Sequence, residues 1–282
     1  MGDYSNADSY SRLSYLFPNV KEYQLSESIK SVGAYAFIDC DSLQMINIPP
    51  NVTYIGKMAF RCFNMNHVEI SDLAAWCGIT FEGYDSNPLL GADLYLNRVK
   101  QTKLVIPSSV TEIKAYTFYG CNSIESVEIP KNVKSIESRA FANCPNLSHI
   151  ILPDNEIKFS AHCFENCPLL ISAGPKGSGC SVEYEWKDKI PAKFLYYCSG
   201  ITKVLIPSTI TSIGEYAFHG CGNIKDVYID ATVPPTVESN AFSTYGNLYV
   251  PKGTKSAYSS ANVWKNFNII EMEDETTYQK AT

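Results

Sequence analysis

The sequence predicts an α/β repeat solenoid, in which short parallel strands stack into a sheet and single helical or 3-10 turns lie on the opposite side. The first observation is a period: Pro107 and Pro130 stand 23 residues apart, and the apolar residues from Val110 to Pro130 recur at the same interval in the following stretch. A self-similar period of this size is typical of stacked repeats. The second is the length of the unit, which is too short to bury its own apolar side, so each coil needs neighbours. We therefore expect function on a long repeated surface and not in one closed pocket.

The repeating unit has two recognisable halves. It can be written L-x-x-I-x-I-P-x-x-V-x-x-I-x-x-x-A-F-x-x-C. The alternation in residues 46–48, Ile-Asn-Ile, predicts a short strand with one buried side, and the proline that follows limits its length. The Ala-Phe-x-x-Cys half is too short for a full helix, which predicts a single helical or 3-10 turn.

This pattern resembles the BspA-like, or Treponema-type, leucine-rich repeat, in which Ile-Pro and Ala-Phe replace the Leu and Asn landmarks of other leucine-rich repeats. The resemblance covers roughly residues 17–272. It implies a right-handed leucine-rich repeat solenoid. It also implies an exported, surface-attached protein of the adhesin or host-interaction kind, whose relatives attach to matrix proteins.

The repeat frame gives the expected elements in order. A leader over residues 1–16 precedes the array, regular units fill 17–60, and a tail covers 273–282. From Phe60 to Phe118 the distance is 58 residues, two periods plus 12, which places an insertion at about 71–102. Its start, 71–77, is typical of a short capped helix, and a hairpin is expected with 94–96 and 103–106 as its strands.

A second insertion is expected at about 171–187, because Phe164 and Leu195 are 31 residues apart. Its glycines and proline predict a loop over 171–180 that interrupts the ladder of strands. After two regular units, a strand near 248–251, a helix over 254–264 and a strand at 268–270 predict a C-terminal cap at about 248–272. A terminal repeat needs such an atypical cap to end the stack.

Composition excludes several classes of partner. The net charge is −6, and the scattered Lys and Arg residues favour neither nucleic acid nor a polybasic membrane patch. No run approaches the ~18 apolar residues of a membrane span.

The start of the chain lacks the pattern of a secretion signal, so either the protein stays inside or its export signal lies outside this chain. The resemblance favours a cell-surface or secreted protein. We expect a monomer.

Seven of the ten cysteines fall in one frame, six of them three residues after a framed Phe or Leu and Cys62 one place earlier. Periodic placement predicts reduced, inaccessible packing thiols; bridges between adjacent coils are the alternative.

His162 and Cys163, with Cys167 nearby, could indicate a metal site or a thiol nucleophile, but Cys167 should point inward. The loop at 174–179 lacks the residue order of a phosphate-binding loop, and the acidic residues lack a calcium-binding pattern. We therefore expect no catalytic residue, metal or cofactor.

The outward side of the strands remains as the candidate site. Outward positions do not repeat although the core does, and large apolar groups gather there in the C-terminal half, with the insertion at 174–179 as a wall beside them. We expect protein binding through His149, Ile151, Lys203, Leu205, Asp226, Tyr228 and Tyr249. The alternative is that β-forming residues merely sit well on a sheet.

Three functions follow from these observations. The first is a non-enzymatic protein-binding module, with an extracellular matrix or host surface protein as the ligand implied by the resemblance. The second is a structural spacer within a longer surface chain. The third, and least supported, is a thiol-dependent hydrolase, for which the sequence offers only His162 and Cys163.

Overall fold

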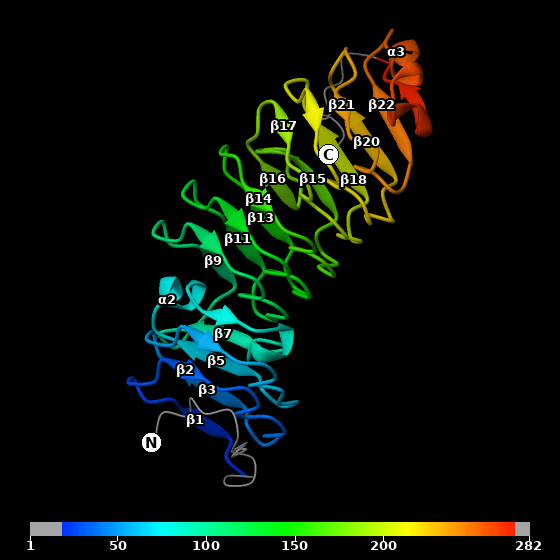
Figure 1. The fold of residues 1–282 in the computed structure, drawn as a ribbon. Helices are drawn as coiled ribbons and strands as arrows, with labels where there is room; N and C mark the ends of the chain where they lie inside the picture. Colours follow the sequence, from blue (N-terminus) through cyan, green and yellow to red (C-terminus); the bar gives the residue numbers. More distant parts are fainter. Residues whose placement is uncertain (1–18, 274–282) are drawn as a thin grey trace.

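The computed structural model describes residues 19–273 and shows an elongated solenoid of stacked coils (Figure 1). Each coil has three sides: a main strand, a short second strand, and an edge of tight turns. The expected leader at 1–16 lies outside the described residues, as does the tail after Glu273. Within the described range, no helix is long and apolar enough to cross a membrane.

The main strands form two sheets, and neighbouring coils pair in parallel. In the regular coils the paired residues are 23 apart, as in Tyr23 with Ile46 and Val127 with Ile150. The first sheet has the order β1 (Glu22–Gln24), β3 (Met45–Ile48), β5 (His67–Ile70), β7 (Asp93–Leu96) and β8 (Val99–Lys100). The second has the order β9 (Lys103–Val105), β11 (Ser126–Glu128), β13 (His149–Ile151), β16 (Val182–Tyr184), β15 (Ser172–Pro175), β18 (Lys203–Ile206), β20 (Asp226–Ile229), β22 (Asn247–Val250) and β23 (Asn268–Glu271).

The second side of the coils carries three small parallel sheets. They consist of β2 (Ser31–Val32), β4 (Tyr54–Ile55) and β6 (Thr80–Phe81); β10 (Glu112–Ile113), β12 (Ser135–Ile136) and β14 (Lys158–Phe159); and β17 (Lys189–Ile190), β19 (Ser212–Ile213) and β21 (Thr236–Val237). They arise from the V-x-x-I half of the repeat, whose last position holds Ile, Val or Phe and is buried in every coil except at Val237, which is half-buried.

The turn edge holds the coils together with a hydrogen-bond ladder of its own. Within one turn, the N–H groups of Tyr116, Phe118 and Gly120 all donate to carbonyls of the next coil, at 2.8 to 3.2 Å. They can point the same way because Tyr116 and Gly120 adopt left-handed φ angles of 63° and 71°. Left-handed backbone costs a non-glycine residue energy, so these intercoil bonds hold the tyrosine in that conformation.

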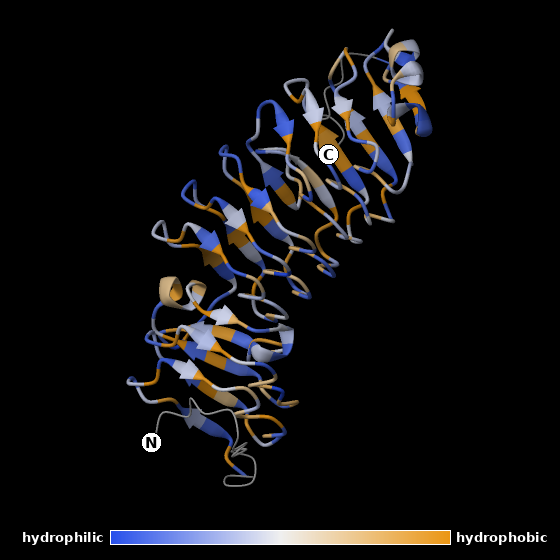
Figure 2. Cartoon of the chain, in the orientation of Figure 1, coloured by the Kyte–Doolittle hydropathy of each residue, from blue (hydrophilic) through white to orange (hydrophobic). Residues whose placement is uncertain are grey.

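Apolar residues recur at equivalent places along the stack and form its core (Figure 2). The framed phenylalanines stack from coil to coil, with ring centroids 5.1 Å apart for Phe118 and Phe141 and 5.8 Å apart for Phe141 and Phe164. All three are buried. The continuous core is therefore shared between coils, as the period predicts.

The framed cysteines are part of this core and link adjacent coils. Cys144 Sγ donates to the carbonyl of Phe118 at 3.2 Å, and Cys167 Sγ to that of Phe141 at 3.1 Å. All ten cysteines lie in the described range and are free thiols; nine are buried, but Cys62 is only half-buried. The expectation that all seven framed thiols are inaccessible is therefore wrong for Cys62.

The first insertion contains α2 (Leu73–Cys77), β6, the 3-10 helix η1 (Tyr84–Ser86) and a hairpin. The capped helix is confirmed, with Asp72 accepting from the N–H groups of Ala74 and Ala75. The hairpin is tighter than predicted, because β7 pairs with β8 and not with residues 103–106. Asn97 and Arg98 both have left-handed φ angles, which suit a two-residue hairpin turn.

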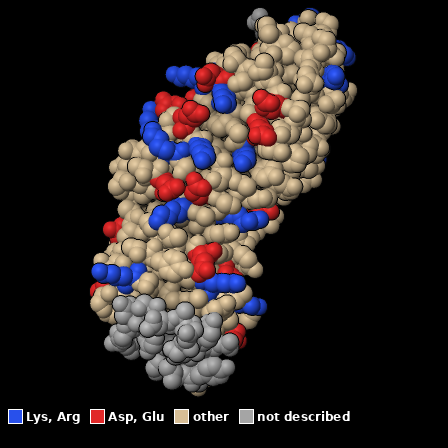
Figure 3. Space-filling model, in the orientation of Figure 1, with Lys and Arg blue, Asp and Glu red and all other residues tan. Residues whose placement is uncertain are grey.

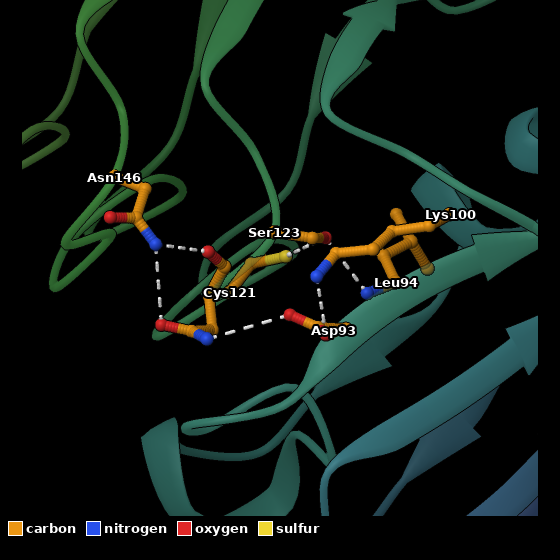
Figure 4. A network of polar contacts seen from close by, with 7 residues as sticks. Asp93, Leu94, Lys100, Cys121, Ser123 and Asn146 are labelled. Carbon is orange, nitrogen blue, oxygen red and sulfur yellow. Dashed lines mark hydrogen bonds and ion pairs between the residues drawn. The ribbon is translucent and has the colours of Figure 1, made fainter.

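This hairpin is the reason that the main strands divide into two sheets. β8 pairs with the edge of β7 that the next coil would otherwise use, and β9 begins a new sheet. Side chains join the two parts (Figure 4): Ser123 Oγ accepts from the N–H of Leu94 at 2.9 Å, and Asn122 Nδ2 donates to Asp93 Oδ1 at 3.5 Å, while Asp93 also pairs with Lys100 of the hairpin at 2.7 Å. Asn146 and Asn122 continue the network into the following coil.

The second insertion does not interrupt the ladder. It supplies β15 and β16, which add a strand to the sheet in the order β13, β16, β15, β18. The predicted loop over 171–180 is therefore wrong for Ser172–Pro175, which pair with β16 and β18. The loop proper is residues 176–181, which we call the covering loop.

The C-terminal cap consists of β22, α3 (Lys255–Ser260), the 3-10 helix η2 (Trp264–Asn266) and β23. The single helix expected over 254–264 is thus two shorter pieces. Tyr258 and Trp264 are fully buried and donate to the carbonyls of Ala231 and Pro235 at 2.7 and 2.8 Å. These bonds fasten the cap to the preceding coils.

Candidate functional site

The structure places the predicted binding residues in two groups. His149 and Ile151 lie on β13, which β16 and β15 separate from β18. The other residues lie on the consecutive strands β18, β20 and β22. Lys203, Asp226, Tyr228 and Tyr249 are half-buried and close together, and we call them, with Asn247 and Asn268, the ladder face.

Leu205 is a correction to the predicted site. Its position is outward, in register with Tyr228, but its side chain is completely buried. The covering loop lies against the sheet here: a side chain on Gly174 would meet Cys180 Sγ and Ser178 Oγ at 2.9 Å and Leu205 Cβ at 3.1 Å. Glu183 holds the loop by accepting from the N–H of Gly179 at 2.9 Å. The insertion thus covers the face at Leu205 and does not form a wall beside it.

Two tyrosines form the apolar half of the ladder face. The rings of Tyr228 and Tyr249 are nearly parallel, 7° apart, with centroids separated by 4.4 Å. Lys203 Nζ lies 5.4 Å from the centroid of Tyr228, an attractive cation–π geometry. Because each ring faces its neighbours along the stack, a ligand approaching from solvent meets ring edges and hydroxyl groups. Stacking of a flat ligand on these faces is therefore not favoured.

A row of polar side chains runs beside the tyrosines. Asn268 Nδ2 donates to Asn247 Oδ1 at 2.8 Å, and Asn247 Nδ2 donates to Asp226 Oδ1 at 3.0 Å. Burial, with Tyr249 and the Asp226 carboxylate nearby, raises the pKa of Tyr228, which therefore keeps its proton and can donate. The ladder face thus offers fixed donors and acceptors around an aromatic pair.

Sequence reasoning missed a second aromatic surface, on the turn edge. His162, Tyr196, Tyr197, Tyr216 and His219 form a continuous cluster with ring centroids 4.6 to 6.0 Å apart, and we call it the turn-edge cluster. These residues lie two before, one after or two after the framed Phe or Leu of their coils. The outward positions of the turns, read in the repeat frame as the strands were, would have revealed them.

A third group lies on the outward side of the first sheet. The rings of His67 and Tyr95 are stacked, with centroids 3.7 Å apart, and His67 Nε2 lies 3.2 Å from Glu69 Oε2. Glu69 is buried and also accepts from the N–H of Arg98 at 2.8 Å. Its carboxylate is thus satisfied within the protein, and this group fixes the hairpin turn.

The structure does not bring His162 and Cys163 together as a thiol nucleophile with its base. Cys163 is buried, and its Sγ donates to the carbonyls of Ser160 and Ile136 at 3.1 and 3.2 Å, whereas His162 lies in the turn-edge cluster. Burial raises the pKa of Cys163 to about 12, so it is a poor nucleophile at neutral pH. Within residues 19–273, no three His, Cys, Asp or Glu side chains gather closely enough to hold a metal ion.

Charge is mixed over the surface in view. Figure 3 shows Lys and Arg side chains interspersed with Asp and Glu, without a large patch of one sign. Nucleic-acid binding depends on such a basic patch. On this face, specificity must come from the shape and hydrogen bonding of particular side chains.

Comparison with known proteins identifies the family. The family model described as BspA type leucine rich repeat region matches six copies over residues 12–83, 90–176 and 188–277. No curated protein matches the chain.

Three solved structures are similar to this chain at low sequence identity. One is a leucine-rich repeat protein from Eubacterium ventriosum, 17% identical, with 89% of this chain and 81% of that chain covered and a TM-score of 0.42. A second is a leucine rich cell surface protein from Faecalibacterium prausnitzii, 17% identical, with 93% and 90% covered and a TM-score of 0.39. A third is the pneumococcal vaccine antigen PcpA, 12% identical, with 91% and 80% covered and a TM-score of 0.43. From its own repeats and the match to the family model over most of its length, the chain belongs to the BspA-type leucine-rich repeat family.

Proposed function

We propose that this chain is a non-catalytic protein-binding module and that the ladder face is where its partner docks. The observation that carries the proposal is the combination of stacked Tyr228 and Tyr249 with a hydrogen-bonded polar row beside them. Aromatic anchors beside polar groups are typical of binding hot spots.

Rigidity supports this choice of surface. The stack fixes both rings, and the hydrogen bonds along Asp226, Asn247 and Asn268 fix the polar groups. Side chains that are already ordered lose less entropy when a partner binds, so more of the contact energy appears as affinity. His149 and Ile151 would form a second contact region beyond the covering loop, while Leu205 supports the sheet from beneath that loop.

The partner class and location follow from the family. We propose a protein ligand of the extracellular matrix or host surface kind, met by a protein that acts at the cell surface or after secretion. Membership of the BspA-type repeat family supports this assignment. A spacer within a longer surface chain is the alternative, and it requires no specific contact at the ladder face.

The test uses the double variant Tyr228→Ala with Tyr249→Ala. Binding to a panel of purified extracellular-matrix and host-surface proteins would be measured by surface plasmon resonance. We expect the partner identified with the wild-type chain to bind the variant at least ~2 kcal/mol more weakly, because both anchors are lost. Thermal unfolding should stay close to that of the wild type, since both rings lie on the outward side.

The matched control is Tyr196→Ala with Tyr197→Ala, which removes two rings from the turn-edge cluster. This control should bind as the wild type does. Loss of binding in the control together with unchanged binding in the ladder-face variant would move the site to the turn edge. No binding by the wild type to any panel protein would favour the spacer function.

A further inference from the structure

We propose that Cys40 and Cys62 form a peroxide-sensitive thiol pair, which closes into a disulfide that ties the first coil of the solenoid to the second. The proposal concerns the N-terminal coils and is independent of the ladder face. Cys62 departs from the repeat frame: the other framed cysteines stand three residues after the framed Phe or Leu, but Cys62 stands two after Phe60. A tight turn, with the N–H of Cys62 donating to the carbonyl of Phe60 at 2.7 Å, accommodates this shift.

The Cys62 thiol and the Cys40 backbone converge on one carbonyl group. Cys62 Sγ donates to the carbonyl of Phe37 at 2.9 Å, and the backbone N–H of Cys40 donates to the same oxygen at 3.2 Å. The two thiol groups also interact with each other, and this interaction lowers the pKa of Cys40 and raises that of Cys62. Cys40 is thus the member of the pair that more readily becomes a thiolate.

Exposure distinguishes this pair from the other cysteines in the column. Cys62 is half-buried and Cys40 is 8% exposed, so a small oxidant can reach them. Cys144 and Cys167 also lie on adjacent coils, and their thiols interact too, but neither is more than 1% exposed. Cys198 and Cys221 lie on adjacent coils and are fully buried. These two pairs serve as controls, because they also lie on adjacent coils but are not accessible to solvent.

The chemistry balances with hydrogen peroxide as the oxidant. The Cys40 thiolate attacks one peroxide oxygen, the O–O bond breaks, and the departing hydroxide takes up a proton to give water and a sulfenic acid. Cys62 sulfur then attacks the sulfenic sulfur, and a second water leaves as the S–S bond forms. Two electrons pass from the two sulfurs to the peroxide. An external dithiol reverses the reaction.

Because of where the pair lies, a disulfide between its members would stabilise the first coil of the described stack. β1 pairs only with β3, so within residues 19–273 the first coil has a single neighbour. A coil at the end of a stack has half the stabilising contacts of an interior one. A covalent link between Cys40 and Cys62 would hold this coil in place and restrict its unfolding from the end of the stack.

The experiment exposes the folded wild-type chain to hydrogen peroxide at a dose that oxidises free cysteine in the same solution. After denaturation and alkylation, peptide mass spectrometry locates the disulfides. We expect a Cys40–Cys62 link that dithiothreitol removes, together with alkylated, reduced cysteines at 144, 167, 198 and 221. The thermal midpoint should rise on oxidation and return on reduction.

A variant separates the two steps. In Cys62→Ser, peroxide should produce no link and no rise in midpoint, and Cys40 should be trapped as a sulfenic acid by dimedone. The mapping on the wild type stands without this variant, should it fold poorly. Cysteines 40 and 62 that stay fully alkylatable after the peroxide dose, or links that form first among the buried pairs, would overturn the proposal.

Discussion

The core side chains of this protein make many of their packing contacts with the neighbouring coils. Phe141 contacts Phe118 on one side and Phe164 on the other, and none of the three is more than 1% exposed. Phe63 is a useful contrast, since it belongs to the same array but is 74% exposed. Whether a ring faces its neighbour coil or the solvent decides its contribution to stability.

Phe141→Ala should lower the free energy of unfolding by about 3–5 kcal/mol, because removal of the ring leaves a cavity between two stacked rings. Phe63→Ala should change it by less than about 0.5 kcal/mol, as is usual for exposed positions. Urea denaturation of both variants, followed by circular dichroism, measures the difference. Equal midpoints for the two variants would show that the Phe141 ring is not part of a shared core.

Asp230 gives the protein a dependence on pH. Burial raises the pKa of this carboxyl from 3.8 to about 6. Below about pH 4 the group is protonated in both states and costs nothing. Between about pH 4 and pH 6 the unfolded state loses its proton while the folded state keeps it, so stability falls over this window, and the loss is complete above about pH 6.

Asp230→Asn should therefore stabilise the protein at pH 7.5, by on the order of 1 kcal/mol once partial exposure is allowed for, and should have little effect at pH 4. Thermal unfolding of the variant and the wild type at both pH values provides the measurement. A gain of the same size at both pH values would mean that ionisation of Asp230 is not the cause.

At the scale of elements, the insertion that supplies β15 and β16 shows how one glycine shapes the surface. Gly174 leaves room for the covering loop, which in turn buries Leu205. Glu183 fixes the loop through the N–H of Gly179, and Lys176 pairs with Glu185 beside it. The loop is thus a structured part of the sheet face.

Gly174→Ala should displace the covering loop, because the new Cβ would lie 2.9 Å from Cys180 Sγ and Ser178 Oγ. We expect faster hydrogen exchange over residues 176–181 and at Leu205, together with a thermal midpoint lower by a few degrees. Gly222→Ala is the control, since a Cβ there meets no atom within 4 Å. Unchanged exchange at 176–181 in Gly174→Ala would show that the loop does not depend on this contact.

At the scale of the whole molecule, the stack of coils stays continuous although the insertions make some coils irregular. The sheet breaks between β8 and β9, yet the turn edge and the network around Asp93, Asn122 and Ser123 carry the stack across the break (Figure 4). At the far end, buried Tyr258 and Trp264 close the core. The result is one elongated body whose surfaces differ from coil to coil.

The sequence by itself determined the repeated part of this protein. The 23-residue period, the strand at Ile46-Asn47-Ile48 and the buried column of Phe118, Phe141 and Phe164 all follow from local pattern, because each coil sees nearly the same neighbours. The outward positions of Tyr228 and Tyr249 follow from strand alternation in the same way.

Only the tertiary structure decided how the chain is arranged where the repeat is irregular. The pairing of β8 with β7, the entry of β16 between β13 and β15, and the burial of Leu205 each depend on where an insertion lies in space. Leu205 alternates outward as predicted, but the covering loop lies over it. Alternation fixes the side of the sheet to which a side chain points, whereas exposure depends on which distant segment packs against that side.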